Sequence, residues 1–476
     1  MIPQRRFATL LDQARAYQQS RCLYHNAPLR NQAYSLYTDH VCDRDAFPRV
    51  TTAVLSVHED EVWNLEWSHN GRYLATASKD KTAIIWRVEF DKDPRYRAYA
   101  PEFILRDHEY PVGCVSWSSD DSILLTASEH RITLWSSRTG LKVRSLEQHT
   151  DVVTALAWLP DGSGFISGGL DRKIILWDAD GKLRDTWGRT PIRVTDLQVT
   201  PDFTRLVAVG MYDMMPPPDA TGAAAGAAGV GTGAAGGAAA GVGGRVAETR
   251  IIIYDLATKQ PELSIRIEGE LTSVKVSQDS QYALINRASE NGPPAIHLID
   301  LTDGRVVRKY VGHSQSKHVI RSCFGGVEEN FILSGSEDGK VYIWHRETGV
   351  LLEELAGHGE GSVNSVAWNP ANERMFASCS DDRTVRIWEA PPAEVLSASG
   401  AALTEPVEET DGEHGMENGK ASGKGKARWD ADPSGSGSGS SSMAGASGSG
   451  SGTAGASSSS TDAESGYGLG STTALF

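Results

Sequence analysis

The residues of this sequence with the clearest potential for chemistry are histidines, each followed by a serine or threonine, an aspartate and a tryptophan. Histidine, serine and aspartate are the components of a hydrolase triad, in which histidine activates the hydroxyl. This set occurs four times at similar spacing, whereas one triad suffices for catalysis. We therefore expect four hydrogen-bonded networks that rigidify repeated units. The sets are His58, Thr76, Asp80, Trp86; His149, Ser167, Asp171, Trp177; His313, Ser334, Asp338, Trp344; and His358, Ser378, Asp382, Trp388.

The four sets belong to a repeat that runs through most of the chain. Weaker copies end at Trp135, Tyr254 and Ile299, which gives seven repeats at a spacing of about 42–49 residues with one longer interval. A period of about 40–45 residues with an early His and a late Trp is typical of WD repeats, each a four-stranded propeller blade. The sequence therefore predicts an all-β, seven-bladed WD-repeat propeller. The three weaker blades lack the full polar set, and we expect apolar packing alone to hold them.

The ring is expected to close through its N-terminal end. A strand-like run precedes each repeat, but none follows Trp388, where the chain continues with two prolines. Residues 51–57 would then supply the outer strand of the last blade and remove two open sheet edges.

Three segments lie outside the propeller, which is assigned to residues 51–390. Residues 1–50 form an N-terminal arm, in which residues 4–20 have the apolar spacing of a short helix. An Ala/Gly insertion at about 214–247 interrupts blade 4, and residues 391–476 are acidic and then Ser/Gly-rich. The insertion and the tail contain too few large apolar side chains to offset their chain entropy, so we expect both to be disordered.

The arm also contains four side chains of the types that bind zinc. They are Cys22, His25, His40 and Cys42. Close pairs of such residues are typical of structural zinc sites. Neither pair has the usual finger spacing, however, and the apolar residues beside them favour packing on the propeller. We therefore expect no metal and no other cofactor.

Composition argues against several classes of protein. A net charge of −15 is unsuited to a general nucleic-acid platform, which needs a basic surface. Five scattered cysteines fit a reduced compartment, and we find neither a signal-peptide pattern nor an apolar run long enough to span a membrane. We expect a cytoplasmic and nuclear protein with protein partners, and no sequence feature specifies homo-oligomerisation.

The predicted binding surface surrounds the central channel of the propeller. It comprises residues that enter the inner strands or precede the set aspartates: Glu61, Trp63, Lys79, His318, Ile320, Glu337, Ser362, Asn364 and Asp381. Trp63 stands out because large aromatic side chains anchor interfaces. It could instead pack between blades 1 and 7.

Several motifs go beyond the general repeat pattern. RCLYHN and DHVCDRDAFP in the arm, and IRSCFGG and FILSGSEDGKVYIWHR in the propeller, resemble the WD-repeat subunit of the CTLH (GID) E3 ubiquitin-ligase complex. The resemblance runs from about residue 4 to 390. It implies a non-catalytic subunit that organises a RING-type ligase and presents substrates for proteasomal degradation. It also implies LisH and CTLH helices before the propeller, of which this sequence contains only what resembles the last.

Two other classes of propeller remain open. A signalling propeller resembling the G-protein beta subunit would need a long N-terminal coiled-coil helix, and the apolar stripe here covers only 17 residues. A cullin-4 substrate receptor usually carries Trp-Asp-x-Arg after the third strand, whereas the sequence after Trp177 is Asp-Ala-Asp. Both classes are weaker matches than the ligase subunit.

Overall fold

The computed structural model describes residues 5–26, 40–89, 98–212, 248–289, 292–316 and 318–390. These residues form seven four-stranded antiparallel sheets, a helix and short 3-10 turns. The predicted insertion at about 214–247 and the predicted tail at 391–476 lie outside the described residues. The exact domain boundaries stay predictions.

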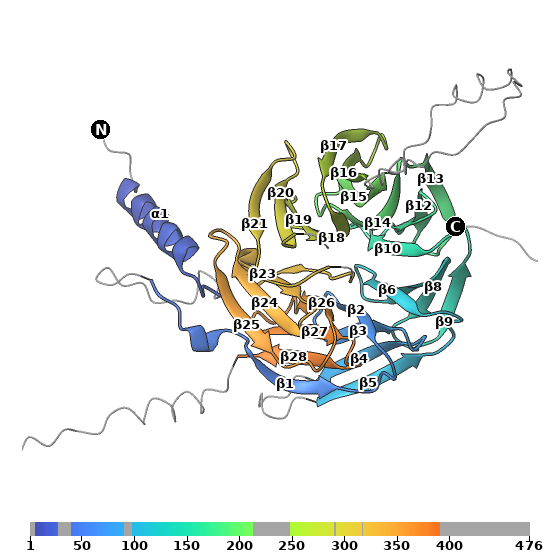
Figure 1. Cartoon of the computed structure of the whole chain (residues 1–476), viewed down its shortest axis with the longest axis horizontal. Coiled ribbons are helices and arrows are strands. Elements are labelled where there is room, and N and C mark those ends of the chain that lie inside the picture. Colours follow the sequence, from blue (N-terminus) through green and yellow to red (C-terminus); the bar gives the residue numbers. More distant parts are fainter. Residues whose placement is uncertain are drawn as a thin grey trace, which may run out of the picture. The chain divides into compact units, whose positions relative to one another are not determined.

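Each sheet is one blade of a propeller, as the repeat predicts (Figure 1). The first four blades contain β2 (Val62–Trp67), β3 (Tyr73–Ser78), β4 (Ala83–Glu89), β5 (Ala98–Leu105); β6 (Val112–Trp117), β7 (Ile123–Ser128), β8 (Arg131–Ser136), β9 (Lys142–Leu146); β10 (Val153–Trp158), β11 (Gly164–Gly169), β12 (Lys173–Asp178), β13 (Leu183–Arg189); and β14 (Ile192–Val199), β15 (Arg205–Tyr212), β16 (Glu248–Asp255), β17 (Pro261–Ile267). Blades 5 to 7 contain β18 (Glu270–Val276), β19 (Tyr282–Ala288), β20 (Ala295–Asp300), β21 (Val306–Tyr310); β22 (Cys323–Gly325), β23 (Phe331–Gly335), β24 (Lys340–His345), β25 (Leu351–Ala356); and β26 (Val363–Trp368), β27 (Met375–Ser380), β28 (Val385–Glu389), β1 (Val50–Leu55).

The apolar core of the propeller lies between neighbouring blades. The second strands β11 and β27 are buried at every position, because a neighbouring blade covers each face, whereas the outer strand β13 is largely exposed. Seven apolar clusters each combine residues of two adjacent blades. A blade therefore cannot bury its apolar surface alone, which is the physical reason for the repeat.

The ring closes through the N-terminal strand, as predicted. Strand β1 pairs antiparallel with β28, with Val54 opposite Arg386, and completes blade 7 (Figure 1). Leu55 of β1 joins the apolar cluster between blades 7 and 1. Two segments far apart in sequence are thus held together without a covalent bond.

The arm begins with helix α1 (Arg6–Arg21), close to the predicted range, and continues to a 3-10 turn η1 (Arg44–Ala46). The predicted apolar stripe is not buried by the described residues, since Phe7 and Tyr17 are 73% and 62% exposed. The helix is instead fixed at its C-terminal end, where Gln19 and the capping residue Cys22 are buried. None of the described helices is both long and apolar enough to cross a membrane.

Candidate functional site

Three of the four predicted polar sets form the same hydrogen-bonded chain. In blade 7, His358 Nδ1 lies 3.0 Å from Asp382 and His358 Nε2 lies 2.7 Å from Ser378 Oγ. Trp388 Nε1 donates to the same hydroxyl at 2.8 Å. Blades 1 and 3 repeat this arrangement, and in all three the central hydroxyl is 0% exposed. An enclosed hydroxyl cannot reach a substrate, so the chains stabilise the blades.

Hydrogen bonds keep the aspartate of this chain ionised. Burial by itself would raise the pKa of Asp382, but His358, the backbone N–H of Gly359 and the Thr384 hydroxyl together hold that pKa well below its usual range. A buried carboxylate is tolerated here because its acceptor positions are filled.

The predicted set in blade 6 does not form, which corrects the sequence analysis. Tyr342 donates its hydroxyl hydrogen to Asp338 at 2.8 Å, and Trp344 Nε1 donates to the carbonyl oxygen of Val311 at 3.0 Å. Ser334 donates to the carbonyl of the next residue. His313 is buried, and neither of its ring nitrogens has a hydrogen-bond partner among the described residues.

Blade 2 contains a polar network, although the sequence analysis expected apolar packing alone to hold this blade. His108 Nε2 lies 2.9 Å from Thr126 Oγ1, and Trp135 Nε1 donates to the same oxygen at 2.9 Å. In place of the aspartate, the carbonyl of Lys81 in blade 1 lies 3.2 Å from His108 Nδ1. The sequence signal was available, because His108 precedes Thr126 by the same 18 residues that separate His58 from Thr76.

Three of the predicted binding residues form one cluster on blade 1. Glu61 accepts a hydrogen bond from Trp63 Nε1 at 2.9 Å and lies 2.8 Å from Lys79 Nζ. The hydrogen bond from Lys79 is the main cause of a lowered pKa at Glu61. Trp63 is half-buried and Lys79 is exposed, so this cluster offers a partner both aromatic and charged contacts.

In blade 6, the predicted residue Glu337 orders the loop before the inner strand. Its carboxylate accepts hydrogen bonds from the backbone N–H and hydroxyl of Ser316 and from the backbone N–H of His318. The His318 side chain is exposed. His318 is therefore accessible to a partner, and half-buried Glu337 supports the loop that carries it.

Three other predicted binding residues are buried, which corrects their assignment. Ile320, Ser362 and Asn364 are 0%, 1% and 5% exposed. Asn364 Nδ2 donates to the carbonyl of Val62 in blade 1 at 3.0 Å and to Asp381 at 2.7 Å. Asn364 therefore holds blade 7 to blade 1, and half-buried Asp381 supports it.

The same inter-blade hydrogen bond recurs at other junctions and explains the error. The side chains of Thr154 and Thr195 each occupy the bulge of an inner strand and donate to a carbonyl of the next blade at 2.8 Å. Trp63 occupies this bulge in blade 1, and Gly113 occupies it in blade 2 with open space around the Cβ position. A polar residue at this position donates a hydrogen bond to the neighbouring blade. Trp63 donates instead to Glu61 of its own blade and remains available for contact with a partner.

The arm is attached across the junction of blades 6 and 7. Glu353 of β25, which is 6% exposed, accepts hydrogen bonds from Tyr24 and, through both carboxylate oxygens, from Arg44. Burial and the Glu353 bond raise the pKa of Tyr24 to about 12. Phe47 is 1% exposed and packs edge-on against Phe331 within the apolar cluster of the two blades. No sequence pattern points to Glu353, because it occupies an outer strand and resembles an ordinary surface residue.

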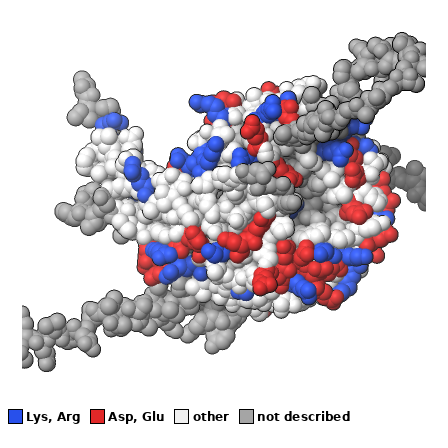
Figure 2. All heavy atoms as spheres, in the orientation of Figure 1, with Lys and Arg blue, Asp and Glu red and all other residues white. Residues whose placement is uncertain are grey.

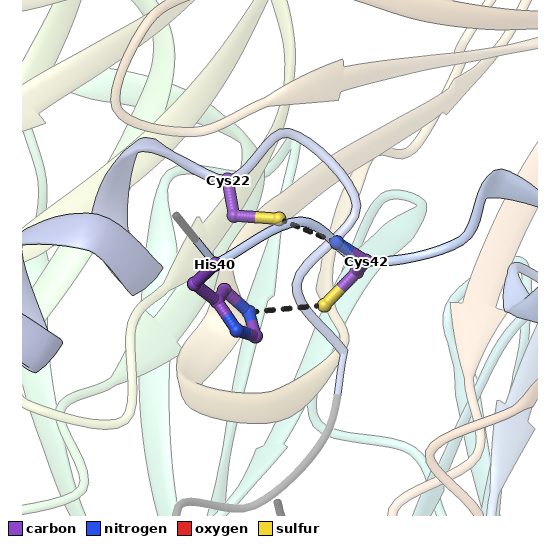
Figure 3. A group of neighbouring side chains, drawn as sticks. All are labelled: Cys22, His40 and Cys42. Carbon is purple, nitrogen blue, oxygen red and sulfur yellow. Dashed lines mark hydrogen bonds between the residues drawn. The ribbon is translucent and has the colours of Figure 1, made fainter. Parts of the chain in front are cut away.

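The four zinc-type residues of the arm converge in space. His25 Nδ1 lies 3.0 Å from His40 Nε2 and 3.4 Å from Cys42 Sγ. His40 Nε2 lies 3.1 Å from the same sulfur (Figure 3). The backbone N–H of Cys42 donates to Cys22 Sγ at 3.2 Å. Burial lowers the pKa of His25, which favours the neutral ring. The sequence analysis considered these four residues as a zinc-type set but favoured their packing on the propeller.

Charged side chains are intermixed on the face shown in Figure 2. Acidic side chains gather over the lower part of the described blades in this view, with basic groups among them, and no broad basic area is visible on this face. Neighbouring charges also pair, as Lys142 does with Asp107 and Arg205 with Glu262. A face of this kind is suited to protein contacts rather than to a phosphate backbone.

The repeat architecture and the hydrogen-bonded chains define a WD-repeat protein. The family "WD domain, G-beta repeat" matches residues 49–87, 100–136, 140–178, 304–345 and 349–389. Blades 4 and 5 are not among these matches, although they fold as blades. They are two of the repeats whose polar set is incomplete.

Comparison with individual proteins shows which WD-repeat proteins this chain resembles over most of its length. The chain is 39% identical over 388 residues to GID complex subunit 7 of Schizosaccharomyces pombe, covering 82% of this chain and 67% of that protein. It is 36% identical over 391 residues to the WD repeat-containing protein 26 homolog of Arabidopsis thaliana, and 38% identical over 395 residues to the WD repeat-containing protein WDS homolog of the same plant. It spans 58% and 66% of the lengths of these two relatives. The chain belongs to the WD-repeat family that contains these proteins.

Proposed function

We propose that this protein is a non-catalytic scaffold of a GID/CTLH-type complex, which joins a RING-type ubiquitin ligase to its protein substrates in the cytoplasm and nucleus. The observation that carries the proposal is the 39% identity to GID complex subunit 7 across 82% of the chain. Because this match covers most of the chain rather than a single repeat, it supports more than a shared fold.

The geometry supports a scaffold in two ways. The Ser and Thr hydroxyls of the three polar chains are enclosed, which favours a structural role over hydrolysis. The cluster of Glu61, Trp63 and Lys79 provides an accessible aromatic anchor beside charges, the combination on which protein interfaces depend. We assign this cluster as the first contact surface to test.

Affinity purification with mass spectrometry tests the proposal. The full-length tagged chain, expressed together with the subunits of a GID/CTLH complex, is expected to recover the RING subunit. A double variant, Trp63→Ala with Lys79→Glu, should recover less than about a tenth as much, since hot-spot truncation costs about 2 kcal/mol or more. Asn364 is left unchanged because it holds the ring together.

The matched control changes the same residue types in blade 3, one on the outer strand β13 and one just before it. Trp187 is half-buried and Lys182 is exposed, so Trp187→Ala with Lys182→Glu should retain the ligase subunit. Circular dichroism checks that both variants fold. Recovery of a G-protein gamma subunit or a cullin-4 adaptor by the wild-type chain, in place of ligase subunits, would refute the proposal.

A further inference from the structure

We propose that Cys22, His25, His40 and Cys42 bind a structural Zn²⁺ ion that fixes the N-terminal arm. Two thiolates and two imidazoles are a common ligand set for structural zinc, which is four-coordinate and tetrahedral. The four residues come from two short stretches of the arm, Cys22 to His25 and His40 to Cys42. Figure 3 shows Cys22, His40 and Cys42 close together, and His25 Nδ1 lies 3.4 Å from Cys42 Sγ.

The distances between the donor atoms match a zinc site. With Zn–S near 2.3 Å and Zn–N near 2.0–2.1 Å, tetrahedral donors lie about 3.3–3.8 Å apart. Here His25, His40 and Cys42 donor atoms are 3.0–3.4 Å apart, and those of Cys22, His40 and Cys42 lie within 4.8 Å of one another. Coordination by all four would move the donor atoms of His25, His40 and Cys42 slightly apart and bring the Cys22 sulfur closer to them.

Hydrogen bonding alone accounts poorly for this arrangement. His25 Nδ1, His40 Nε2 and Cys42 Sγ form a nearly equilateral triangle. An imidazole N–H points in one direction within the ring plane and cannot be directed along two edges of a triangle. The two rings are inclined at 83°, which further prevents a shared direction. A cation coordinated by these atoms would satisfy every donor atom at once.

The surroundings also suit an ion. The N–H of Cys42 donates to Cys22 Sγ, the kind of hydrogen bond that supports a metal-bound thiolate. His25 and Cys22 are 4% and 8% exposed, which shields the site. A cavity of about 600 Å³ lined by Cys22, His40 and Cys42 provides an entry path.

The ion would strengthen the link between two parts of the arm that the hydrogen bond from the Cys42 N–H to Cys22 Sγ already joins. Cys22 caps helix α1, and Cys42 precedes the residues that attach the arm to blades 6 and 7, Arg44 and Phe47. Zinc would therefore hold the end of the helix close to the propeller. This role is independent of which partners the propeller binds.

Metal analysis of the full chain, produced alone in bacteria so that no RING subunit contributes zinc, tests the proposal. We expect about one zinc per chain. Replacement by Co²⁺ should give the visible absorption and thiolate charge-transfer bands of a tetrahedral Cys₂His₂ site. Cys22→Ser with Cys42→Ser should lower zinc content by at least about fivefold, because two of four ligands are lost. Cys114→Ser and His318→Ala, which alter the same residue types elsewhere, should leave it unchanged.

Loss of zinc should also loosen the arm. Trypsin should cleave after Arg21 faster when a chelator is present, while melting of the propeller stays nearly unchanged. The proposal is wrong if the wild-type chain lacks zinc and gives no tetrahedral cobalt spectrum. It is equally wrong if the double variant keeps its zinc, or if peptide mapping without reductant finds a Cys22–Cys42 disulfide in freshly purified protein.

Discussion

Blades 6 and 7 are neighbours with the same predicted polar set, yet only blade 7 forms the hydrogen-bonded chain. The residue two positions before the Trp accounts for the difference. In blade 7 it is Arg386, and the Asp382 carboxylate is left to His358. In blade 6 it is Tyr342, whose hydroxyl binds the Asp338 carboxylate instead. A single tyrosine hydroxyl can therefore take the aspartate away from the histidine of an otherwise complete set.

The consequence in blade 6 is a buried histidine, His313, whose ring nitrogens have no hydrogen-bond partner among the residues that the structure describes. Burial lowers the pKa of His313 to about 4. Burial lowers the pKa of His358 as well, but the Asp382 carboxylate opposes the shift. Blade 6 relies on ring stacking, with His313 edge-on to Trp344 and Trp344 stacked on Tyr342. We expect the two blades to respond differently to truncation, substitution and acid.

The largest effect should come from removing the strand that blade 7 takes from the N-terminus. A chain that starts at His58 lacks β1, so blade 7 loses its outer strand and exposes a sheet edge, while blade 6 keeps β25. We expect aggregation, or a melting temperature lower by more than about 10 °C. A chain that starts at Arg49 keeps β1 but lacks the arm, and comparison of the two by calorimetry isolates ring closure. Equal melting would contradict the closure.

Substitution of the two aspartates should separate the blades next. Asp382→Ala leaves His358 and Thr384 without their shared acceptor and should lower the free energy of unfolding by about 1–3 kcal/mol. Asp338→Ala removes one hydrogen bond from Tyr342 at a more exposed site and should cost less than about 1 kcal/mol. Urea unfolding measures both. Equal losses would mean that the complete hydrogen-bonded set adds no stability to blade 7.

Acid should weaken blade 6 through His313. An unfolded histidine takes up a proton near pH 6.5, whereas the folded His313 does so near 4. The free energy of unfolding that depends on neutral His313 is therefore fully present above pH 6.5 and decreases as the pH falls toward 4. The loss reaches about 1 kcal/mol by pH 5.5. His108 and His297 also have pKa values lowered to about 4, so the measurement is the difference in slope between wild type and His313→Leu. Parallel slopes would exclude this contribution.

The smallest effect is the coupling that diverts the blade 6 aspartate. A double-mutant cycle of Tyr342→Phe with Asp338→Ala should give an interaction free energy of about 0.5–1 kcal/mol. Tyr282→Phe, in blade 5, should be additive with Asp338→Ala. Additivity at Tyr342 would remove our explanation for the difference between the blades.

The repeat period, the number of blades and the strand that closes the ring were determined by the sequence alone. These features depend on spacing along the chain: a late Trp marks each third strand, and the prolines after Trp388 end the strand pattern. Tyr254 and Ile299 could also be recognised as equivalents of the late Trp, because the apolar residue at this position packs between neighbouring blades.

Sequence spacing predicted three of the four polar sets correctly, but only the tertiary structure decided where polar side chains depart from the repeat. Sequence spacing identified His313 and Asp338 as a pair, but the hydroxyl of Tyr342 occupies the carboxylate. Asn364 looked like a surface residue because its partner, the carbonyl of Val62, lies about 300 residues away in sequence. The arm cysteines and histidines converge for the same reason, since contacts between distant segments depend on how the chain packs and leave no periodic signal in the sequence.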